Sequence, residues 1–252
     1  MYNGKRELHI TEKSQKTQAN FFASRIFRIV KDMDKTDLKV LDFGAGTGHL
    51  SEILTRYIKS QGLSVDVTCL ELDSSLQEEI ISRGLHAIEK MEKSQKYDLI
   101  FSSHVLEHIE DDRTVLSNFY TSLKPDGKLF IIVPLHMSLW TQMDQRIGHY
   151  RRYSIAHMKA NLMNSGFVVD SAKNFDSLGF LLGKLMILLK RTDGILKTSK
   201  GLKMIKMYDL VLLPISMLLD ILSFGKLPGR NGIFVASREN NKDTKMTIRI
   251  DI

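Results

Sequence analysis

The 252-residue sequence contains a single cysteine, Cys69, so no disulfide can form within the chain. A lone thiol in an apolar run is typical of a protein kept in a reducing compartment. No segment supplies about twenty uninterrupted apolar residues, the length that a membrane-spanning helix needs. The polar residues after Met1 also lack the apolar core of a signal peptide. These absences argue against secretion by that route, and we expect a cytoplasmic protein.

The composition that remains is that of a globular protein, with 43% hydrophobic and 26% charged residues. The length is sufficient for one large domain, or for a core with an appended subdomain. Lysine and arginine number 36 against 29 aspartates and glutamates, which gives a formal charge of +7. This mild excess suits an anionic substrate, a nucleic acid or an acidic membrane surface, and does not decide among them.

One glycine-rich stretch, VLDFGAGTG at 40–48, organises the chain. Apolar residues lead to Asp42, and then Gly44, Gly46 and Gly48 alternate with small residues before an amphipathic segment begins. This order predicts a buried strand, a tight turn and the start of a helix. Glycine allows the sharp turn, and the first N–H groups of the helix point to the same place. The stretch therefore predicts a site for a nucleotide-type ligand.

Two features of this stretch bear on which ligand it holds. A dinucleotide site is typical of the spacing G-x-G-x-x-G, whereas this chain has G-x-G-x-G and places His49 sixth. Asp42 would repel a pyrophosphate and attract an ammonium or sulfonium group. S-adenosylmethionine carries both cations and no phosphate, so these residues favour it over a nicotinamide. An ordinary strand–helix turn is the alternative that a glycine-rich loop alone leaves open.

Strands and helices alternate along the first two thirds of the chain. Strands are predicted at 39–43, 63–72, 85–88, 97–102 and 128–133, helices at 20–31, 48–60, 75–83 and 111–123, and a turn at 124–127. A final strand at 232–237 is expected to return to the sheet edge. The alternation predicts an α/β fold with a doubly wound, mostly parallel sheet. Ligands bind such sheets at the carboxyl ends of the strands, where Asp42, Glu71, 102–104 and 134–136 would converge.

Four segments together resemble the class I S-adenosylmethionine-dependent methyltransferases, close to their small-molecule type 11/12-like group. They are VLDFGAGTG at 40–48, VTCLELD at 67–73, YDLIFSSHVLEHIEDD at 97–112 and LKPDGKLFIIVP at 123–134. The resemblance implies a Rossmann-like, seven-stranded sheet, with S-adenosyl-L-methionine as cofactor and S-adenosyl-L-homocysteine as product. It assigns cofactor binding to Asp42, Gly44, Gly46, Gly48, Glu71, Leu72, Ser102 and His104. Glu71 would accept the ribose hydroxyls, while the residue that contacts adenine stays open.

A fifth segment, GHYRRYS at 148–154, resembles a methyltransferase subgroup with a GHxRRY signature. Its histidine, arginines and tyrosines offer forked donors for a carboxylate or phosphate, together with aromatic faces. We therefore expect substrate contacts from His136, Arg151, Arg152 and Tyr153. The alternative is that one arginine caps a helix while the tyrosines pack.

Methyl transfer requires an in-line approach of the nucleophile, so positioning supplies much of the rate. A hydroxyl nucleophile also benefits from a base, and His104 and His149 are the candidates for that catalytic role. The HVLEH segment at 104–108 matches an inverted zinc-protease pattern, but its place after a parallel strand argues against that chemistry. Some methyltransferases hold a divalent ion with E-x-x-E-H and a later histidine. Here His104 replaces the first glutamate and His149 could be the later histidine; because of that replacement we expect no metal.

The last third of the chain alternates apolar and basic segments. Residues 178–190 and 208–224 are almost continuously apolar, and 184–206 contain seven lysines or arginines against one acid. Such helices could cap the substrate pocket, or they could contact an anionic membrane or a lipid-linked substrate through 178–225. We expect four parts, namely an N-terminal helical segment (1–35), a cofactor-binding core (36–175), a helical cap (176–230), and a final strand and tail (231–252).

These patterns predict an enzyme that transfers a methyl group from S-adenosylmethionine to a small acceptor. The acceptor is expected to be anionic or linked to a lipid or sugar, and to be methylated on oxygen, with nitrogen and carbon left open. One alternative is an oxidoreductase that uses a nucleotide cofactor. Another is a catalytically inactive, methyltransferase-like protein that binds a membrane surface. No nucleic-acid partner is expected, because no aromatic-basic repeat or zinc module accompanies the positive charge.

Overall fold

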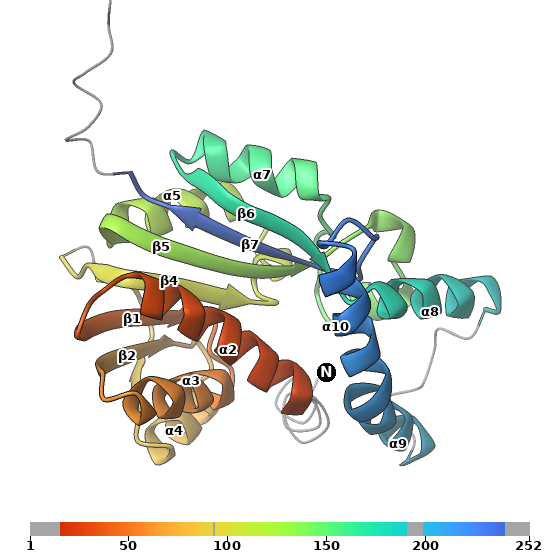
Figure 1. Ribbon diagram of the computed structural model, residues 1–252, viewed down its shortest axis with the longest axis horizontal. Coiled ribbons are helices and arrows are strands. Elements are labelled where there is room, and N and C mark those ends of the chain that lie inside the picture. The colour runs from red at the N-terminus through yellow and green to blue at the C-terminus, as the bar shows by residue number, and fades with distance from the viewer. Residues whose placement is uncertain (1–15, 93, 191–198, 240–252) are drawn as a thin grey trace, which may run out of the picture.

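The computed structural model describes residues 16–92, 94–190 and 199–239. Within them, seven strands form one sheet in the order β3-β2-β1-β4-β5-β7-β6 (Figure 1). The parallel strands are β1 (Asp37–Phe43), β2 (Ser64–Leu70), β3 (His86–Ile88), β4 (Tyr97–Ser103) and β5 (Leu123–Pro134). Strand β7 (Asn231–Ser237) runs antiparallel to both β5 and β6 (Val168–Phe175). The predicted α/β architecture with a mostly parallel sheet is confirmed.

Helices cover both faces of the sheet, and the strands are apolar on both sides as a result. One face packs against α2 (Lys16–Asp32), α3 (His49–Ser60) and α4 (Ser74–Ser82), and the other against α5 (Asp112–Ser122) and α7 (Ile155–Asn164). Neighbouring strand residues alternate between the faces, so that Leu99 belongs to the first core and Ile100 to the second. Each face therefore has its own hydrophobic core.

Two expectations about the last strands are wrong. Strand β5 already begins at Leu123, which pairs with Tyr97, and 124–127 form an irregularity within that strand rather than a turn before it. Strand β7 lies between β5 and β6, so β6 forms the sheet edge instead. Strand β6 has no clear signal in the sequence, because polar residues interrupt its apolar alternation and several of its positions are exposed, as is usual in an edge strand.

The C-terminal helices project from the sheet beyond the ends of β5 and β7 (Figure 1). They are α8 (Ser177–Leu188) and a second rod made of α9 (Ser199–Met207), the π-helical turn η4 (Tyr208–Leu212) and α10 (Leu213–Leu222). Buried carboxylates of the rod cap two other helices. Asp209 accepts backbone N–H groups at the start of α2, and Asp220 accepts them at the start of α8. These bonds attach the rod to α2, which packs on the sheet, and to the start of α8.

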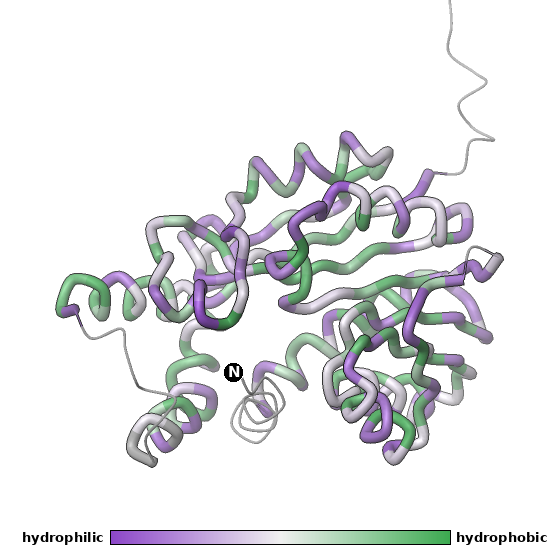
Figure 2. Tube along the Cα trace, turned by 180° about the vertical axis from the view of Figure 1, so that it is seen from behind, coloured by the Kyte–Doolittle hydropathy of each residue, from purple (hydrophilic) through white to green (hydrophobic). Residues whose placement is uncertain are grey.

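No helix in the described part of the chain is long and apolar enough to cross a membrane. The predicted segments at 1–15 and 240–252, and residues 191–198 of the basic segment 184–206, lie outside the described residues. The hydropathy colouring in Figure 2 shows apolar segments running through the sheet and continuing into the C-terminal helices.

Candidate active site

The loop after β1 carries the three glycines, and all of them have positive φ, between 56° and 76°. A Cβ on Gly44 would lie 2.4 Å from Cγ2 of Val105, and one on Gly48 would lie 3.0 Å from Cγ1 of Ile80. Both positions thus need glycine because of their backbone conformation and because the loop packs closely on its neighbours. Gly48 is the N-cap of α3, so no side chain caps the first N–H groups of that helix.

Glu71 follows β2 and reaches the same loop. Its Oε2 accepts the N–H of Gly46 at 2.8 Å, while Oε1 accepts the N–H groups of Leu72 and Asp73 at 2.8 and 3.1 Å. A carboxylate has about four lone-pair positions, so two ribose hydroxyls would share or replace these backbone donors. The Leu72 side chain is 74% exposed at this mouth and offers an apolar surface to a base.

Asp42 lies at the end of β1 with 3% exposure, and its Oδ2 accepts the hydroxyl of Ser51 at 2.7 Å. Burial raises the pKa of Asp42 to about 7, the Ser51 hydrogen bond acts against that shift, and the nearby charge of Glu71 adds to it. A bound cation would favour the ionised carboxylate. This acid therefore suits the positively charged methionine end of S-adenosylmethionine better than it suits a phosphate.

Two of the predicted cofactor residues lie at the end of β4. The hydroxyl of Ser102 is buried and donates to the carbonyl of Phe43 at 3.1 Å, which joins β4 to β1. His104 has a φ of 58°, and its N–H donates to the carbonyl of Ile132 on β5. A positive φ is uncommon for a residue with a Cβ and marks a backbone held by its surroundings. The structure thus places both residues between the central strands.

Both ring nitrogens of His104 have partners. Nδ1 lies 3.2 Å from the hydroxyl of Ser103, and Nε2 lies 3.3 Å from Oδ1 of Asn231 on β7. Burial lowers the pKa of His104 to about 4, although the bond to Asn231 opposes that shift. The imidazole is therefore neutral near neutral pH, and its hydrogen bonds hold it in one orientation. It could position an acceptor or line the pocket, and it could serve as a base only by giving up one of these bonds.

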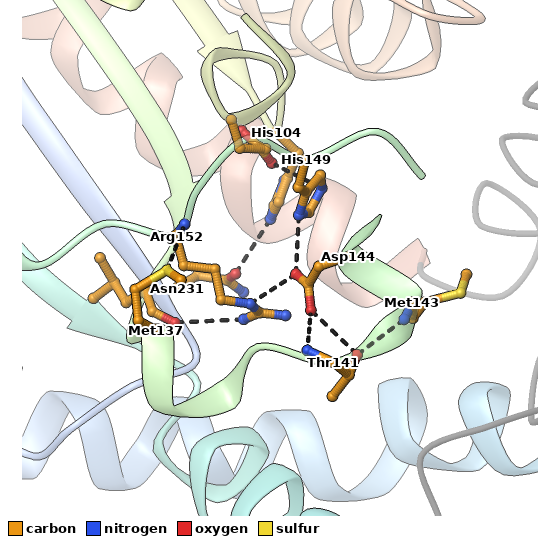
Figure 3. A network of polar contacts seen from close by, with 10 residues as sticks. His104, Met137, Thr141, Met143, Asp144, His149, Arg152 and Asn231 are labelled. Carbon is orange, nitrogen blue, oxygen red and sulfur yellow. Dashed lines mark hydrogen bonds and ion pairs between the residues drawn. The ribbon is translucent and has the colours of Figure 1, made fainter. Parts of the chain in front are cut away.

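His149 belongs to a polar network on the segment that follows β5 (Figure 3). Its Nδ1 lies 2.9 Å from Oδ1 of Asp144, and Nε of Arg152 donates to the same oxygen at 2.7 Å. Asp144 also forms a capping box with Thr141 at the start of α6 (Gln142–Arg146). Burial acts to raise the pKa of Asp144, but hydrogen bonds from His149 and Arg152 outweigh it and lower the pKa. The Asp144 carboxylate thus holds the imidazole of His149 by Nδ1 and leaves Nε2 on the side away from Asp144.

Glu107 lies beside this network in the 3-10 turn η1 (Leu106–His108) and is completely buried. Neither carboxyl oxygen has a hydrogen-bond partner, and Nε2 of His149 is 3.9 Å from Oε1. Burial raises the pKa of Glu107 to about 8. With His108, whose ring stacks edge-on against that of His149, these groups place three ligand-type atoms within 4.8 Å of one another. They could hold a divalent cation, and the expected absence of a metal stays a prediction.

Carboxylates of this chain engage the two arginines of the GHxRRY segment. Arg151 forms an ion pair with Asp112 at 3.0 Å and donates to the carbonyl of Glu110, and Arg152 pairs with Asp144. The Tyr153 hydroxyl is buried and donates to Asp112 at 2.7 Å. The hydroxyl of Tyr153 is therefore turned inward, and the forked donors of the segment already have partners. Fewer side chains of this segment are therefore available to bind a substrate than the sequence predicts.

His136 is the predicted substrate residue that keeps an unpartnered group. It follows β5 with a φ of 63°, its ring lies edge-on to that of Phe180 on α8, and its Nε2 is buried without a hydrogen bond. Backbone bonds between His136 and Tyr153 and between Tyr153 and Pro134 join the GHxRRY segment to the end of β5. The segment thus lies beside the mouth, as expected, although no finding tests the individual substrate roles.

Sequence reasoning missed Asn231 and Asp144. Asp144 could have been found, because Thr141 three residues before it forms the start of a capping box. Asn231 could not, since 127 residues separate it from His104 and nothing local marks it.

Comparison with known sequences identifies the fold family. A sequence model described as a methyltransferase domain matches residues 15–172. The ubiquinone biosynthesis O-methyltransferase of Dictyostelium discoideum is 27% identical over 37% of this chain and 34% of its own length. The malonyl-[acyl-carrier protein] O-methyltransferase of Acetivibrio thermocellus is 29% identical over 50% of this chain and 44% of its own. The chain thus covers less than half of each of these relatives.

A solved structure shares the fold over a larger part of the chain. The phosphoethanolamine N-methyltransferase 2 of Haemonchus contortus, in complex with S-adenosyl-L-methionine, superposes with a TM-score of 0.54 and 19% identity. The match covers 86% of this chain and 53% of that one. At this level of identity the likeness concerns the fold alone.

Proposed function

The chain belongs to the methyltransferase-domain family, an enzyme family whose methyl donor is S-adenosylmethionine, and we propose that it methylates an oxygen of a small anionic or lipid- or sugar-linked acceptor. The family match covers 15–172, which includes the glycine loop, Glu71 and the network around His149. It favours methyl transfer over the nicotinamide chemistry that the glycine loop alone leaves open. The two relatives above carry O-methyltransferase names, which supports oxygen as the acceptor atom.

The residues at the mouth fit the cofactor in charge and in hydrogen bonding. Asp42 is a buried acid that a cation would stabilise, Glu71 presents a carboxylate to hydroxyls, and the uncapped start of α3 presents N–H groups. Bound S-adenosylmethionine supplies an electrophilic methyl group at its sulfonium. The work of the chain is then to hold the acceptor in line with that methyl and to receive a proton.

The single observation that carries oxygen methylation is the bond between Asp144 and His149. Because Asp144 holds Nδ1–H, Nε2 is the nitrogen that can accept a proton from a hydroxyl. A base of this kind matters for a hydroxyl, which is a poor nucleophile until it loses its proton, and matters less for an uncharged amine. We assign the base to His149 and a positioning role to His104, whose ring nitrogens are both engaged.

The acceptor is proposed to be anionic because basic groups surround the mouth on its C-terminal side. Lys184 lies near the carbonyl of Ser138, and Arg230 flanks the start of β7. The unpartnered Nε2 of His136 adds a donor or acceptor for a polar headgroup. Part of this charge is already paired within the chain, so we expect recognition by a few groups rather than by the whole GHxRRY segment.

Calorimetric titration with S-adenosylhomocysteine, with NADH in parallel, is the first test. We expect micromolar binding of the thioether, none of NADH, and loss of binding in Asp42→Ala. Binding of NADH alone would contradict the proposed cofactor.

The second test follows transfer of labelled methyl groups to pooled hydroxy acids, phosphorylated alcohols and amines. Mass spectrometry of the product would locate the new bond on oxygen or nitrogen. We expect O-methyl products, and we expect His149→Gln to reduce turnover about a hundredfold with unchanged cofactor affinity. Asp144→Asn should reduce turnover less, since it disturbs the orientation of the base without removing it. Exclusively N-methyl products would refute the assignment to oxygen.

A further inference from the structure

The C-terminal helices expose a concentration of large apolar side chains. Of the twenty-two exposed large hydrophobic residues in the described chain, fifteen lie between 181 and 227. Single exposed hydrophobic residues are ordinary on a protein surface, but a cluster of this extent marks an interaction site. We call this group, on α8, on the rod α9–η4–α10 and on the residues just after it, the C-terminal apolar surface.

The rod buries several polar side chains and exposes many of its apolar ones. Asp209, Ser216 and Asp220 follow one another at helical spacing and are buried, each accepting backbone N–H groups of α2 or α8. Val211 and Leu218, on the remaining side, are 52% and 56% exposed. A helix that packs only on its own protein normally turns its apolar face inward. This rod also buries Leu213 in the first core, but three of its polar side chains face inward and most of its large apolar side chains stay exposed.

The charges on these helices are arranged to match an anionic surface. Within 177–190 and 199–229 the acidic residues are Asp209 and Asp220, and both are buried. The exposed charged residues there are lysines, among them Lys184, Lys203 and Lys206. Lysines with long apolar stems at the rim of an apolar face are typical of proteins that bind membrane interfaces.

We propose that the C-terminal apolar surface docks on an anionic lipid bilayer, with its leucines in the interface and its lysines against the headgroups. The docking is a binding activity in addition to methyl transfer and does not depend on the acceptor. A second copy of the chain is the competing occupant. It fits less well, because a symmetric contact would bring the same lysines of both copies together without an exposed acid to pair with them.

Flotation with lipid vesicles tests the proposal on the full chain. The vesicles are phosphatidylcholine alone, or phosphatidylcholine mixed with phosphatidylglycerol. We expect flotation with the anionic mixture and much less with the neutral lipid. The double variant Leu185→Ser, Leu218→Ser should reduce binding about tenfold or more, because it removes two exposed apolar side chains from the surface. Lys203→Gln and Lys206→Gln should each reduce binding about fivefold.

Matched controls come from the opposite part of the molecule. Ile81 on α4 and Met163 on α7 are 61% and 62% exposed, so Ile81→Ser with Met163→Ser removes comparable apolar surface elsewhere. This control should float like the unmodified protein, and every variant should bind S-adenosylhomocysteine unchanged, which shows that it is folded. Absence of flotation with the anionic vesicles, or equal loss in the control, would overturn the proposal. So would a dimer that Leu185→Ser, Leu218→Ser disperses while vesicles remain unbound.

Discussion

We divide the proposed site into a cofactor half, made of the glycine loop, Asp42 and Glu71, and an acceptor half, made of the segment after β5, the C-terminal helices and β7. The two halves are held together over very different distances along the chain. In the cofactor half, Ser51 bonds Asp42 nine residues away, and Gly46 bonds Glu71 across 25 residues. In the acceptor half, Asn231 reaches back to His104, at the border with the cofactor half, across 127 residues, and Asp209 reaches Thr17 across 192. The cofactor mouth is thus built mainly from neighbouring strand–loop units, whereas the acceptor side is assembled by long-range contacts.

The two halves also use their carboxylates differently. Glu71 is partly exposed and bonds loop N–H groups that a ligand could replace, while Asp209 and Asp220 are buried and cap helices. A substitution in the first half should therefore change ligand affinity more than stability, and one in the second half should do the reverse.

Removal of the Asp209 carboxylate should have the largest effect on stability. Asp209→Ala leaves the N–H groups of Thr17 and Gln18 without their acceptor in a buried position. We expect the free energy of unfolding to fall by about 3 kcal/mol, measured by urea denaturation followed by circular dichroism. Asp66→Ala, at an exposed position of β2, is the control and should change little. A loss of cofactor affinity without a loss of stability would break the comparison.

Glu71→Gln should produce the converse result. The amide keeps the size of the side chain but offers one acceptor oxygen in place of two, so the ribose hydroxyls and the loop N–H groups compete for it. We expect the affinity for S-adenosylhomocysteine to fall about thirtyfold, or about 2 kcal/mol, with the unfolding curve almost unchanged. Glu78→Gln on the exposed side of α4 provides the calorimetric control. A large stability loss in Glu71→Gln would show that the loop depends on this acid for folding.

The same division explains how much the sequence could predict. The strand–turn–helix pattern around Gly44 and the acid that closes β2 are local signals, and they gave the sheet, the mouth and the cofactor. The bonds that bring Glu71 to Gly46 follow from that topology, because parallel strands end at one edge.

The acceptor side could be predicted only in part. The GHxRRY segment was expected at the mouth, but no local pattern showed that Asp112 and Asp144 pair with its arginines. The position of β7 between β5 and β6 was predicted wrongly, since pairing order among antiparallel strands depends on contacts far apart in sequence. The sequence also could not predict that Ser216 and Asp220 of α10 face inward, because the backbone N–H groups that they accept lie about forty residues away, at the start of α8.

The ionisation of Asp42 should make cofactor affinity depend on pH. Since burial raises the pKa of Asp42 to about 7, the carboxyl is neutral in the free protein below that pH and ionised above it. The contribution of Asp42 to the free energy of unfolding is fully present below the pKa that this carboxyl has in the unfolded chain, and it is lost as the pH rises through about 7. A cationic ligand favours the ionised form, so affinity for S-adenosylmethionine should increase about tenfold, or about 1.4 kcal/mol, from about pH 6 to about pH 8.

Calorimetry at several pH values, in buffers of different ionisation enthalpy, would measure this linkage and the release of a proton on binding. Asp42→Asn should bind weakly with an affinity that does not vary with pH. A pH dependence that survives in Asp42→Asn would assign the titration to another group and would weaken the view that the cofactor half acts through local acids.

The smallest effect is expected where the two halves meet. Asn231 lies 127 residues after His104 in the sequence, yet its Oδ1 is 3.3 Å from Nε2 of that imidazole. The Nδ2 of Asn231 is buried without a hydrogen-bond partner. Asn231→Ala removes one hydrogen bond from a neutral, buried imidazole, a change worth about 1 kcal/mol. Because His104 would lose orientation and keep its other partner, Ser103, turnover should fall about fivefold while S-adenosylhomocysteine affinity stays within about twofold.

A second variant separates positioning from simple packing at this junction. Asn231→Asp places a carboxylate beside His104 and should raise the pKa of that imidazole from about 4, which NMR titration of the ring protons would detect as a shifted midpoint. Asn118→Ala, on the exposed side of α5, is the control for both readouts. If Asn231→Ala abolishes cofactor binding, the cofactor half depends on the long-range contacts of the other half. If the effect is confined to turnover and to the His104 titration, Asn231 joins two halves that bind their ligands separately.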